Sequence, residues 1–132
     1  MVKPANAIPD EIEAYLDAQR TEHGEICRRL VAEIRRCLPG ATSRLYHGSP
    51  AWFIGENAVV GVSVKARAGV TLLFWNGQAF KSEALIPVGR FKAAERSFQT
   101  VGEVSAKLLR PLLRKAGEEI WDLAGSRRKR RA

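Results

Sequence analysis

The sequence predicts a two-layer α+β domain, in which an antiparallel sheet of about five strands packs against N-terminal helices and a C-terminal helix. Apolar residues recur at helical spacing near both ends of the chain. Between these two end regions the spacing of apolar residues shortens to that of strands, and only short turn sequences separate the apolar segments. Connections this short favour antiparallel pairing, because a parallel pair needs a long crossover. Helices that lie at the ends of the chain, on either side of such a run of antiparallel strands, are typical of a two-layer α+β domain.

The first third of the chain is predicted to form two helices. Residues 8–11 begin the first helix, since proline is tolerated in a first turn and acidic residues are favoured there. Thr21 is expected to cap the second helix, and Pro39-Gly40 to end it. Every fourth position of the second helix is apolar, which gives it one apolar side. These residues are Ile26, Leu30, Ile34 and Leu38.

The middle of the chain is predicted to form the sheet, because its segments are rich in β-branched and aromatic residues. The predicted strands are 43–47, 51–55, 58–65, 70–75 and 90–98. The predicted turns are 48–50, 55–57, 67–69 and 76–77. Residues 85–88 are interpreted as a loop. Phe91 and Phe98 are expected on opposite faces of the last strand.

Helical spacing returns after Thr100 and continues to Ile120. Pro111 lies inside this pattern, and because proline has no N–H to donate, we expect a kink or a break there. The last seven residues, 126–132, are predicted to form a disordered basic tail. Residues 1–125 are therefore predicted to form one domain, which suits the total length of 132 residues.

The net charge of +8 is unevenly distributed along the chain. Five of these charges lie in the tail, which leaves +3 for the domain. The tail cations are Arg127, Arg128, Lys129, Arg130 and Arg131. Hydrophobic residues make up 45% of the chain and charged residues 27%, a composition that excludes disorder for most of it.

Two further features predict a cytoplasmic protein without a membrane partner. No apolar run approaches the roughly 18 to 20 residues that span a bilayer, and residues 1–6 lack the apolar stretch of a secretory signal. Cys27 and Cys37 lie ten positions apart in one predicted helix, so their Cα atoms should be about 15 Å apart. A disulfide needs less than about 7 Å, so both are interpreted as small apolar residues rather than a redox pair.

Residues 46–53 and 72–80 are the two most aromatic stretches. If the strands that carry them pair, they furnish a cleft with aromatic walls and a few polar tips, and clefts of that kind bind small molecules. The candidate ligand-binding residues are Tyr46, His47, Ser49, Trp52, Trp75, Asn76 and Gln78. The alternative is that the aromatic residues build the core and the polar tips satisfy turns.

No motif for catalysis, metal binding or cofactor binding is present. His47 is the only plausible general base near the aromatic stretches, and no Gly-x-Ser-x-Gly elbow or glycine-rich phosphate loop occurs. The two histidines and two cysteines do not form a metal-ligand pattern. We therefore expect a non-enzymatic binding module for a small molecule or a protein, without a cofactor.

Two alternative functions depend on charge. The basic tail could bind phosphates of nucleic acid, together with basic residues on the second and last helices, or an anionic membrane surface. A solubilising end would have the same composition. Those helical residues are Arg28, Arg29, Arg35, Arg36, Arg110, Arg114 and Lys115. Separately, Asp10, Glu13 and Asp17 share one side of the first helix and could face a hard cation, although acidic residues there are also favoured by the helix dipole.

One ordered set of motifs resembles a known family. The set comprises Tyr46-His47-Gly48-Ser49-Pro50-Ala51-Trp52-Phe53, Val59-Val60-Gly61-Val62, Leu72-Leu73-Phe74-Trp75-Asn76-Gly77, Gly89-Arg90-Phe91-Lys92-Ala93-Ala94 and Trp121-Asp122. Over roughly Ile8 to Leu123 the chain is similar to the YdhG-like domain family, an uncharacterised bacterial family. The resemblance implies a small α+β domain with an antiparallel sheet flanked by helices. One branch of that family is linked to intracellular iron delivery with frataxin-like behaviour, which would point to the acidic side of the first helix.

Overall fold

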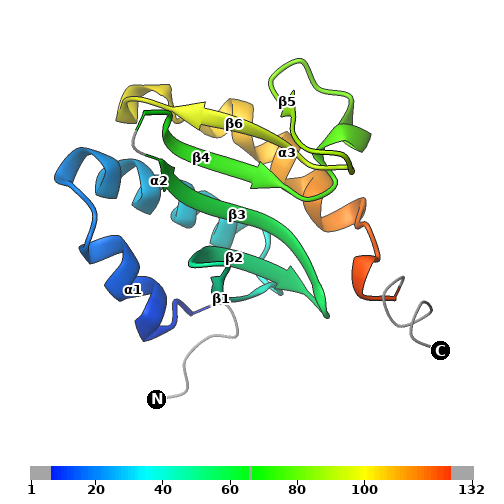
Figure 1. Cartoon of the computed structure of the whole chain (residues 1–132), viewed down its shortest axis with the longest axis horizontal. Helices are drawn as coiled ribbons and strands as arrows, with labels where there is room; N and C mark the ends of the chain where they lie inside the picture. Colours follow the sequence, from blue (N-terminus) through cyan, green and yellow to red (C-terminus); the bar gives the residue numbers. More distant parts are fainter. Residues whose placement is uncertain (1–6, 66, 126–132) are drawn as a thin grey trace.

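The computed structural model describes residues 7–65 and 67–125, and it confirms the α+β class with helices from both ends of the chain on one side of an antiparallel sheet (Figure 1). Its α-helices are α1 (Asp10–Asp17), α2 (Thr21–Cys37) and α3 (Ala106–Glu118). Its strands are β1 (Thr42–Tyr46), β2 (Ser49–Ile54), β3 (Asn57–Lys65), β4 (Gly69–Phe74), β5 (Ile86–Pro87) and β6 (Ala94–Phe98). Two 3₁₀ helices, Gly77–Phe80 and Val101–Glu103, complete the description.

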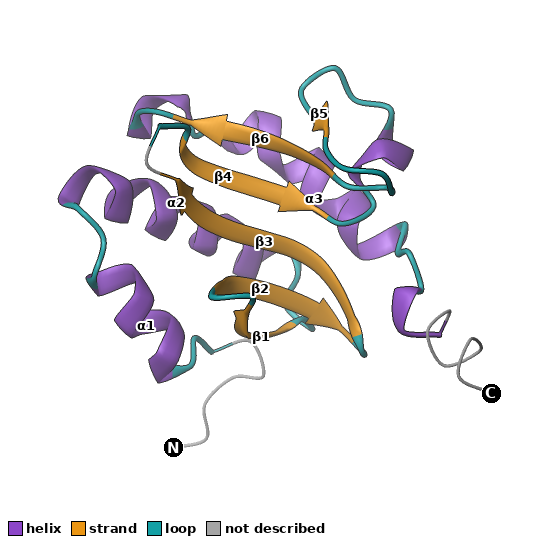
Figure 2. Ribbon diagram, in the orientation of Figure 1, coloured by secondary structure: helices purple, strands orange, loops and turns teal. Residues whose placement is uncertain are grey.

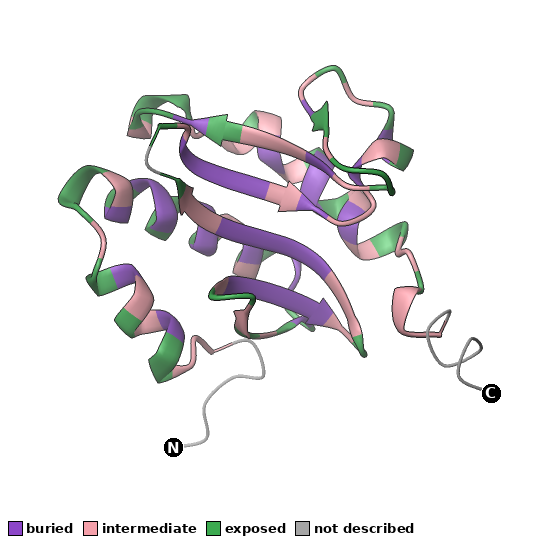
Figure 3. Ribbon diagram, in the orientation of Figure 1, coloured by how far each residue is buried: buried purple, intermediate pink, exposed green. Residues whose placement is uncertain are grey.

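The sheet has the strand order β1-β2-β3-β4-β6-β5, with antiparallel neighbours throughout (Figure 2). Its register places Trp52, Val60 and Phe74 in one row across three strands, facing α2 and α3. These side chains are fully buried, and the apolar stripe of α2 packs against the same core (Figure 3). The core therefore lies between the sheet and the helices, as alternation along the strands requires.

The helices match the sequence prediction with three differences. Thr21 is the first residue of α2 and makes no capping hydrogen bond, because Arg20 occupies the capping position. Of the kink or break expected at Pro111, the break does not occur: α3 continues through this residue, since the buried side chains of Leu109 and Leu113 on either side hold the helix against the core. Ile120, which the helical spacing includes, lies beyond the end of α3.

Two predictions about the strands are wrong at their boundaries. The last strand begins at Ala94 rather than at residue 90, so Phe91 lies on a loop and is 69% exposed. Residues 86–87, interpreted as loop, form the short strand β5 against β6. The cause is the chain reversal at residues 88–93, where the Val88 amide donates to the Ala93 carbonyl at 3.0 Å. That reversal removes residues 90–93 from the sheet.

The first hairpin turn also differs from the prediction of residues 48–50. The turn residues are His47 and Gly48, whose φ angles of 54° and 86° are both positive. Two positive φ angles in a two-residue loop match the twist of the flanking strands, which is why this turn type is favoured in hairpins. Ser49 and Pro50 consequently begin β2, where Ser49 pairs with Tyr46.

The second face of the sheet is not covered by the helices (Figure 1). At one end of this face polar pairs predominate: the Thr71 and Ser97 hydroxyls lie 3.0 Å apart, and Lys65 pairs with Glu95. At the other end aromatic side chains gather. In the described part of the chain, every helix is too short or too polar to cross a membrane.

Candidate binding cleft

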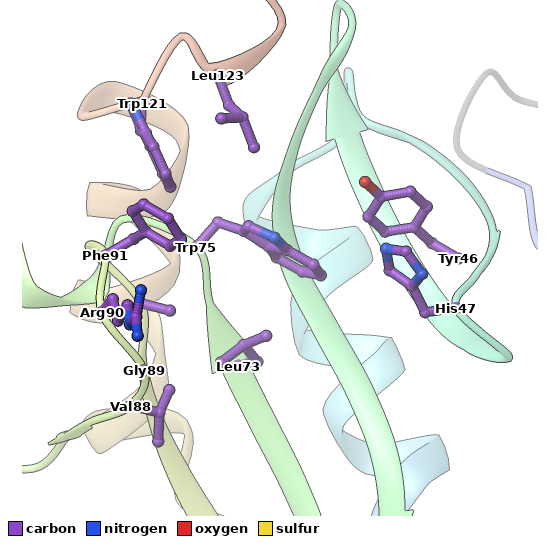
Figure 4. Close-up of a pocket in the computed structure, with 11 residues that line it drawn as sticks. Tyr46, His47, Leu73, Trp75, Val88, Gly89, Arg90, Phe91, Trp121 and Leu123 are labelled. Atoms are coloured by element: carbon purple, nitrogen blue, oxygen red, sulfur yellow. The ribbon is translucent and has the colours of Figure 1, made fainter. Parts of the chain in front are cut away.

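An open cleft of about 560 Å³ lies on the aromatic end of the helix-free face (Figure 4). Its lining comes from the β1–β2 hairpin, the end of β4, the loop before β6 and the segment after α3. The lining residues are Tyr46, His47, Leu73, Trp75, Val88, Gly89, Arg90, Phe91, Ala93, Trp121 and Leu123. The cleft is therefore assembled from segments that are far apart in the sequence.

The β1–β2 hairpin supplies one wall of the cleft. Tyr46 ends β1, and its ring centroid lies 4.1 Å from that of His47 and 6.0 Å from that of Trp75. Phe53 meets Tyr46 edge-on, with the ring centroids 5.4 Å apart. The guanidinium of Arg44 lies 4.3 Å from the centre of the Phe53 ring and 5.2 Å from that of Tyr46, which adds a cation to this aromatic group.

Trp75 lies between the two walls of the cleft, where its indole rests on β3 (Figure 4). The contact depends on Gly61, because a Cβ at that position would lie 3.0 Å from Trp75 Cζ3. The backbone amide of Trp75 donates to the Val59 carbonyl at 3.1 Å, which continues the pairing of β4 with β3 by one residue. A glycine on β3 thus lets the indole approach the sheet closely.

The opposite wall combines a loop aromatic with a tryptophan from the segment after α3. The centroids of Phe91 and Trp121 lie 5.9 Å apart with their planes tilted by 33°. Lys92 Nζ lies 5.3 Å from the centre of the Trp121 ring. The side-chain amide of Gln78 donates to the Ala93 carbonyl at 2.9 Å and anchors this loop. This wall, too, places a cation beside aromatic rings.

Two asparagines hold the segment that carries Trp121 and Leu123. Asn57 Nδ2 donates to Asp122 Oδ1 at 3.1 Å, and Asn57 Oδ1 accepts from the Ala124 amide at 2.9 Å. Asn76 Nδ2 donates to the Glu119 carbonyl at 2.8 Å. Because these side-chain hydrogen bonds tie the short segment to the sheet, the position of Trp121 depends on them.

Replacing Asn57 with alanine should loosen this segment without unfolding the domain. Two hydrogen bonds of about 0.5–1.5 kcal/mol each are removed, so amide hydrogen exchange in residues 120–125 should accelerate roughly tenfold or more. Exchange in β3 and β4 should stay unchanged. Gln99→Ala, which removes a similar amide-to-carbonyl bond to Ala68 far from the cleft, is the matched control. Equal rates of amide hydrogen exchange in residues 120–125 of the two variants would contradict this role of Asn57.

The structure brings together three of the seven residues that the sequence assigned to ligand binding: Tyr46, His47 and Trp75. Trp52 instead lies fully buried in the core on the helical side, because alternation along β2 turns it away from the open face. Ser49 pairs with Tyr46 at the start of β2 and does not line the cleft.

Asn76 and Gln78 also lie outside the cleft lining, since their side-chain amides bind backbone carbonyls of Glu119 and Ala93. For Trp52, Asn76 and Gln78 the arrangement is the one that the alternative interpretation describes, with aromatic residues in the core and polar tips satisfying the backbone.

Sequence reasoning missed the wall made by Val88, Phe91, Trp121 and neighbouring residues. The signal for Phe91 was its position between Arg90 and Lys92, since a large aromatic flanked by two cations suits an exposed loop better than a half-buried strand. The signal for Trp121 was its place beyond the regular spacing of α3. Neither signal shows that the two rings meet.

The acidic side of α1 is paired with a cation from the protein itself. Arg28 of α2 bonds to Glu13 at 3.3 Å and to Asp17 at 2.5 Å. Within residues 7–65 and 67–125, no group of three or more His, Cys, Asp or Glu side chains is arranged to hold a metal ion. Two of the three acidic residues considered for iron thus already have a counter-charge.

Several basic residues of the helices also bind within the protein. Arg110 pairs with Glu33 at 3.0 Å, and this guanidinium lowers the pKa of the Glu33 carboxyl. Lys115 Nζ donates to the Phe80 carbonyl at 3.1 Å. With Arg28, at least three of the seven helical cations are therefore engaged. The tail cations Arg127–Arg131 lie outside the described residues.

Both cysteines are free thiols in the structure. Burial raises the pKa of the Cys27 thiol to about 11, and burial also raises the pKa of the half-buried Cys37 thiol. Each thiol is therefore protonated at neutral pH, which makes both poor nucleophiles.

The structure is an α+β domain with an aromatic cleft on the open face of its sheet. Comparisons with protein-family models, with curated proteins and with solved structures found no match for this chain. The resemblance to the YdhG-like family accordingly stays a prediction.

Proposed function

We propose that this protein is a non-enzymatic binding module, which holds a flat aromatic group of a small molecule or of a larger partner in the cleft. One observation carries the proposal: the rings of Tyr46, Trp75, Phe91 and Trp121 come from four separate segments and surround a single opening of about 560 Å³. That volume is typical of ligand-binding clefts, which are lined mostly by apolar and aromatic side chains.

The chemistry of the lining suits stacking. Offset or edge-on contacts between aromatic rings contribute about 0.5–1.5 kcal/mol each beyond the area that they bury. Arg90 lines the cleft, and Arg44 and Lys92 lie against rings at its two walls. An anionic substituent on the bound ring would therefore meet a positive charge on either side. The His47 ring lies against that of Tyr46, with the centroids 4.1 Å apart and the planes tilted by 47°, and so extends the aromatic wall.

Replacing Trp75 with alanine should weaken binding of aromatic ligands by about tenfold or more, because the ring between the two walls is removed. A panel of aromatic acids, indoles and nucleosides, tested by thermal shift and by tryptophan fluorescence, provides the measurement. Ile86→Ala, which removes an exposed apolar side chain outside the cleft lining, is the control and should bind as the native chain does. The proposal fails if no compound binds, or if Trp75→Ala and Tyr46→Ala bind as tightly as the native chain.

A further inference from the structure

Arg90 is the cation that lines the main cleft, and its donors are not used within the described part of the protein. It is the only Asp, Glu, Lys or Arg among the described residues of the lining. It lies beside Phe91, on the wall opposite Tyr46 (Figure 4). Its exposed side chain makes no hydrogen bond, ion pair or ring contact with the described residues. A guanidinium in this state has its N–H donors available to a ligand.

Two acidic side chains of this region are engaged elsewhere and do not neutralise Arg90. Glu95 stands opposite Leu73 in the register of the sheet, and it pairs with Lys65 at 3.6 Å. Asp122, which follows Trp121, accepts a hydrogen bond from Asn57 at 3.1 Å. The positive charge of Arg90 therefore stands at an otherwise apolar and aromatic cleft.

A second, smaller hollow adjoins the main cleft but differs from it in charge. It has a volume of about 210 Å³ and shares Tyr46 and Trp75 with the main cleft. Both Arg44 and Glu56 line it, so it presents both signs of charge. Only the main cleft has a cation and no acid in its described lining. A negative group on a bound ring is therefore better placed in the main cleft, at Arg90.

The loop that carries Arg90 is anchored on both sides of the cation. After it, the backbone amide of Gln78 donates to the Lys92 carbonyl at 2.8 Å, next to the side-chain bond from Gln78 to Ala93. Before it, Gly89 has a φ angle of 70°, in the left-handed region that favours glycine. These features set the position of the Arg90 backbone before any ligand binds, which lowers the entropy cost of binding.

Resting on the proposed function, we infer that the ligand is a small flat aromatic carboxylate and that Arg90 determines this specificity by binding the carboxylate. A guanidinium offers paired N–H donors that match both oxygens of a carboxylate. One arginine balances one negative charge, whereas a phosphate ester carries roughly two at neutral pH. A cationic ligand is disfavoured because Arg90 repels it and because Lys92 already lies against the Trp121 ring.

The test measures the affinity of the full chain for matched sets of ligands by isothermal titration calorimetry. Each set has one ring, which is phenyl, indole or naphthalene, and offers it as the acetate, the uncharged acetamide and the cationic ethylamine. On every ring that binds, the acetate should bind at least tenfold more tightly than the acetamide, and the ethylamine should bind most weakly. Phenyl phosphate and naphthyl phosphate should bind no more tightly than the acetates of the same rings.

Arg90→Gln should lower the affinity for the acetates at least tenfold and leave the affinity for the acetamides unchanged. Arg90→Lys should retain part of the affinity for the acetates, because the charge stays while the paired donors are lost. Arg29→Gln is the matched control, since it removes the same charge from an exposed position on α2, and it should bind as the native chain does. Because Arg90 is exposed and makes no hydrogen bond with the described residues, its replacement should leave the circular dichroism spectrum and the melting temperature unchanged.

Several results would overturn the inference while leaving the proposed function standing, provided that Trp75→Ala still weakens binding. Equal affinity for acetate and acetamide, unchanged in Arg90→Gln, would show recognition of the ring alone. Tightest binding of an ethylamine would show a site for cations, and tightest binding of a phosphate would show a site for phosphate esters. Equal losses in Arg90→Gln and Arg29→Gln would show an effect of net charge. Binding of nucleosides but of none of the acetates would reject the carboxylate. If no aromatic compound binds, the proposed function fails as well.

Discussion

Replacing Trp52 with alanine should lower the free energy of unfolding by about 3–5 kcal/mol, the usual loss for removing a large aromatic side chain from a core. Trp52 is 0% exposed and packs in one row with Val60 and Phe74 beneath α2 and α3. Domains of this size are stable by about 5–15 kcal/mol, so this single change should remove a large share of the stability. Urea denaturation followed by circular dichroism gives the measurement.

Trp75→Ala is the comparison for that result, since it makes the same chemical change on the other face of the sheet. Trp75 is only partly buried, so its loss should lower the free energy of unfolding by clearly less than the loss of Trp52 does. The loss of unfolding free energy in Trp52→Phe should lie between the losses in the two alanine variants, because phenylalanine keeps most of the buried ring. Equal losses for Trp52→Ala and Trp75→Ala would contradict the assignment of Trp52 to the core and of Trp75 to the cleft.

Replacing Gly61 with valine should lower the affinity for aromatic ligands by about tenfold or more, while changing the free energy of unfolding little. A Cβ at residue 61 would lie 3.0 Å from Trp75 Cζ3 and 3.1 Å from Cη2, so the indole must lift away from β3. If the indole stayed in place, the overpacking would cost about 1–3 kcal/mol. Because the ring is at an open surface, we expect it to move instead and to narrow the cleft.

The affinity of Gly61→Val for the best aromatic ligand, measured by titration of tryptophan fluorescence, checks this expectation. Ser63→Val is the matched control, since it places the same side chain on the same face of β3, two residues further along and opposite Thr71. Native affinity in Gly61→Val would show that the position of the indole against the sheet does not matter for binding. Loss of affinity in both variants would point to a general effect on β3.

The helices and the central strands could be predicted because their signals are local. The repeat of apolar residues every fourth position in α2 reports one buried side, whatever that side packs against. Likewise, the short turns between β1, β2, β3 and β4 force antiparallel hairpins. The predicted strand at residues 90–98 is too long, because aromatic residues are typical of strands while a hydrogen-bonded reversal at residues 88–93 removes Phe91 from the sheet.

Trp52 and Trp75 are two residues whose positions local sequence patterns do not predict. Both stand in aromatic stretches next to turns, and a shift of one residue in register exchanges the core face for the open face. The register between β2 and β3, with its irregularity between Trp52 and Phe53, assigns Trp52 to the core. Without that pairing the sequence could not separate a wall of a cleft from a part of the core.

By itself, the sequence determined the α+β class, the antiparallel sheet and the aromatic character of the β1–β2 hairpin and the end of β4, because each follows from the periodicity of neighbouring residues. Only the tertiary structure decided which aromatic residues form the cleft. Phe91 and Trp121 reach Trp75 through the loop reversal at residues 88–93 and through the hydrogen bonds of Asn57 and Asn76 to the segment after α3. These asparagine hydrogen bonds join residues 43 to 67 positions apart, and no local pattern encodes interactions over such separations.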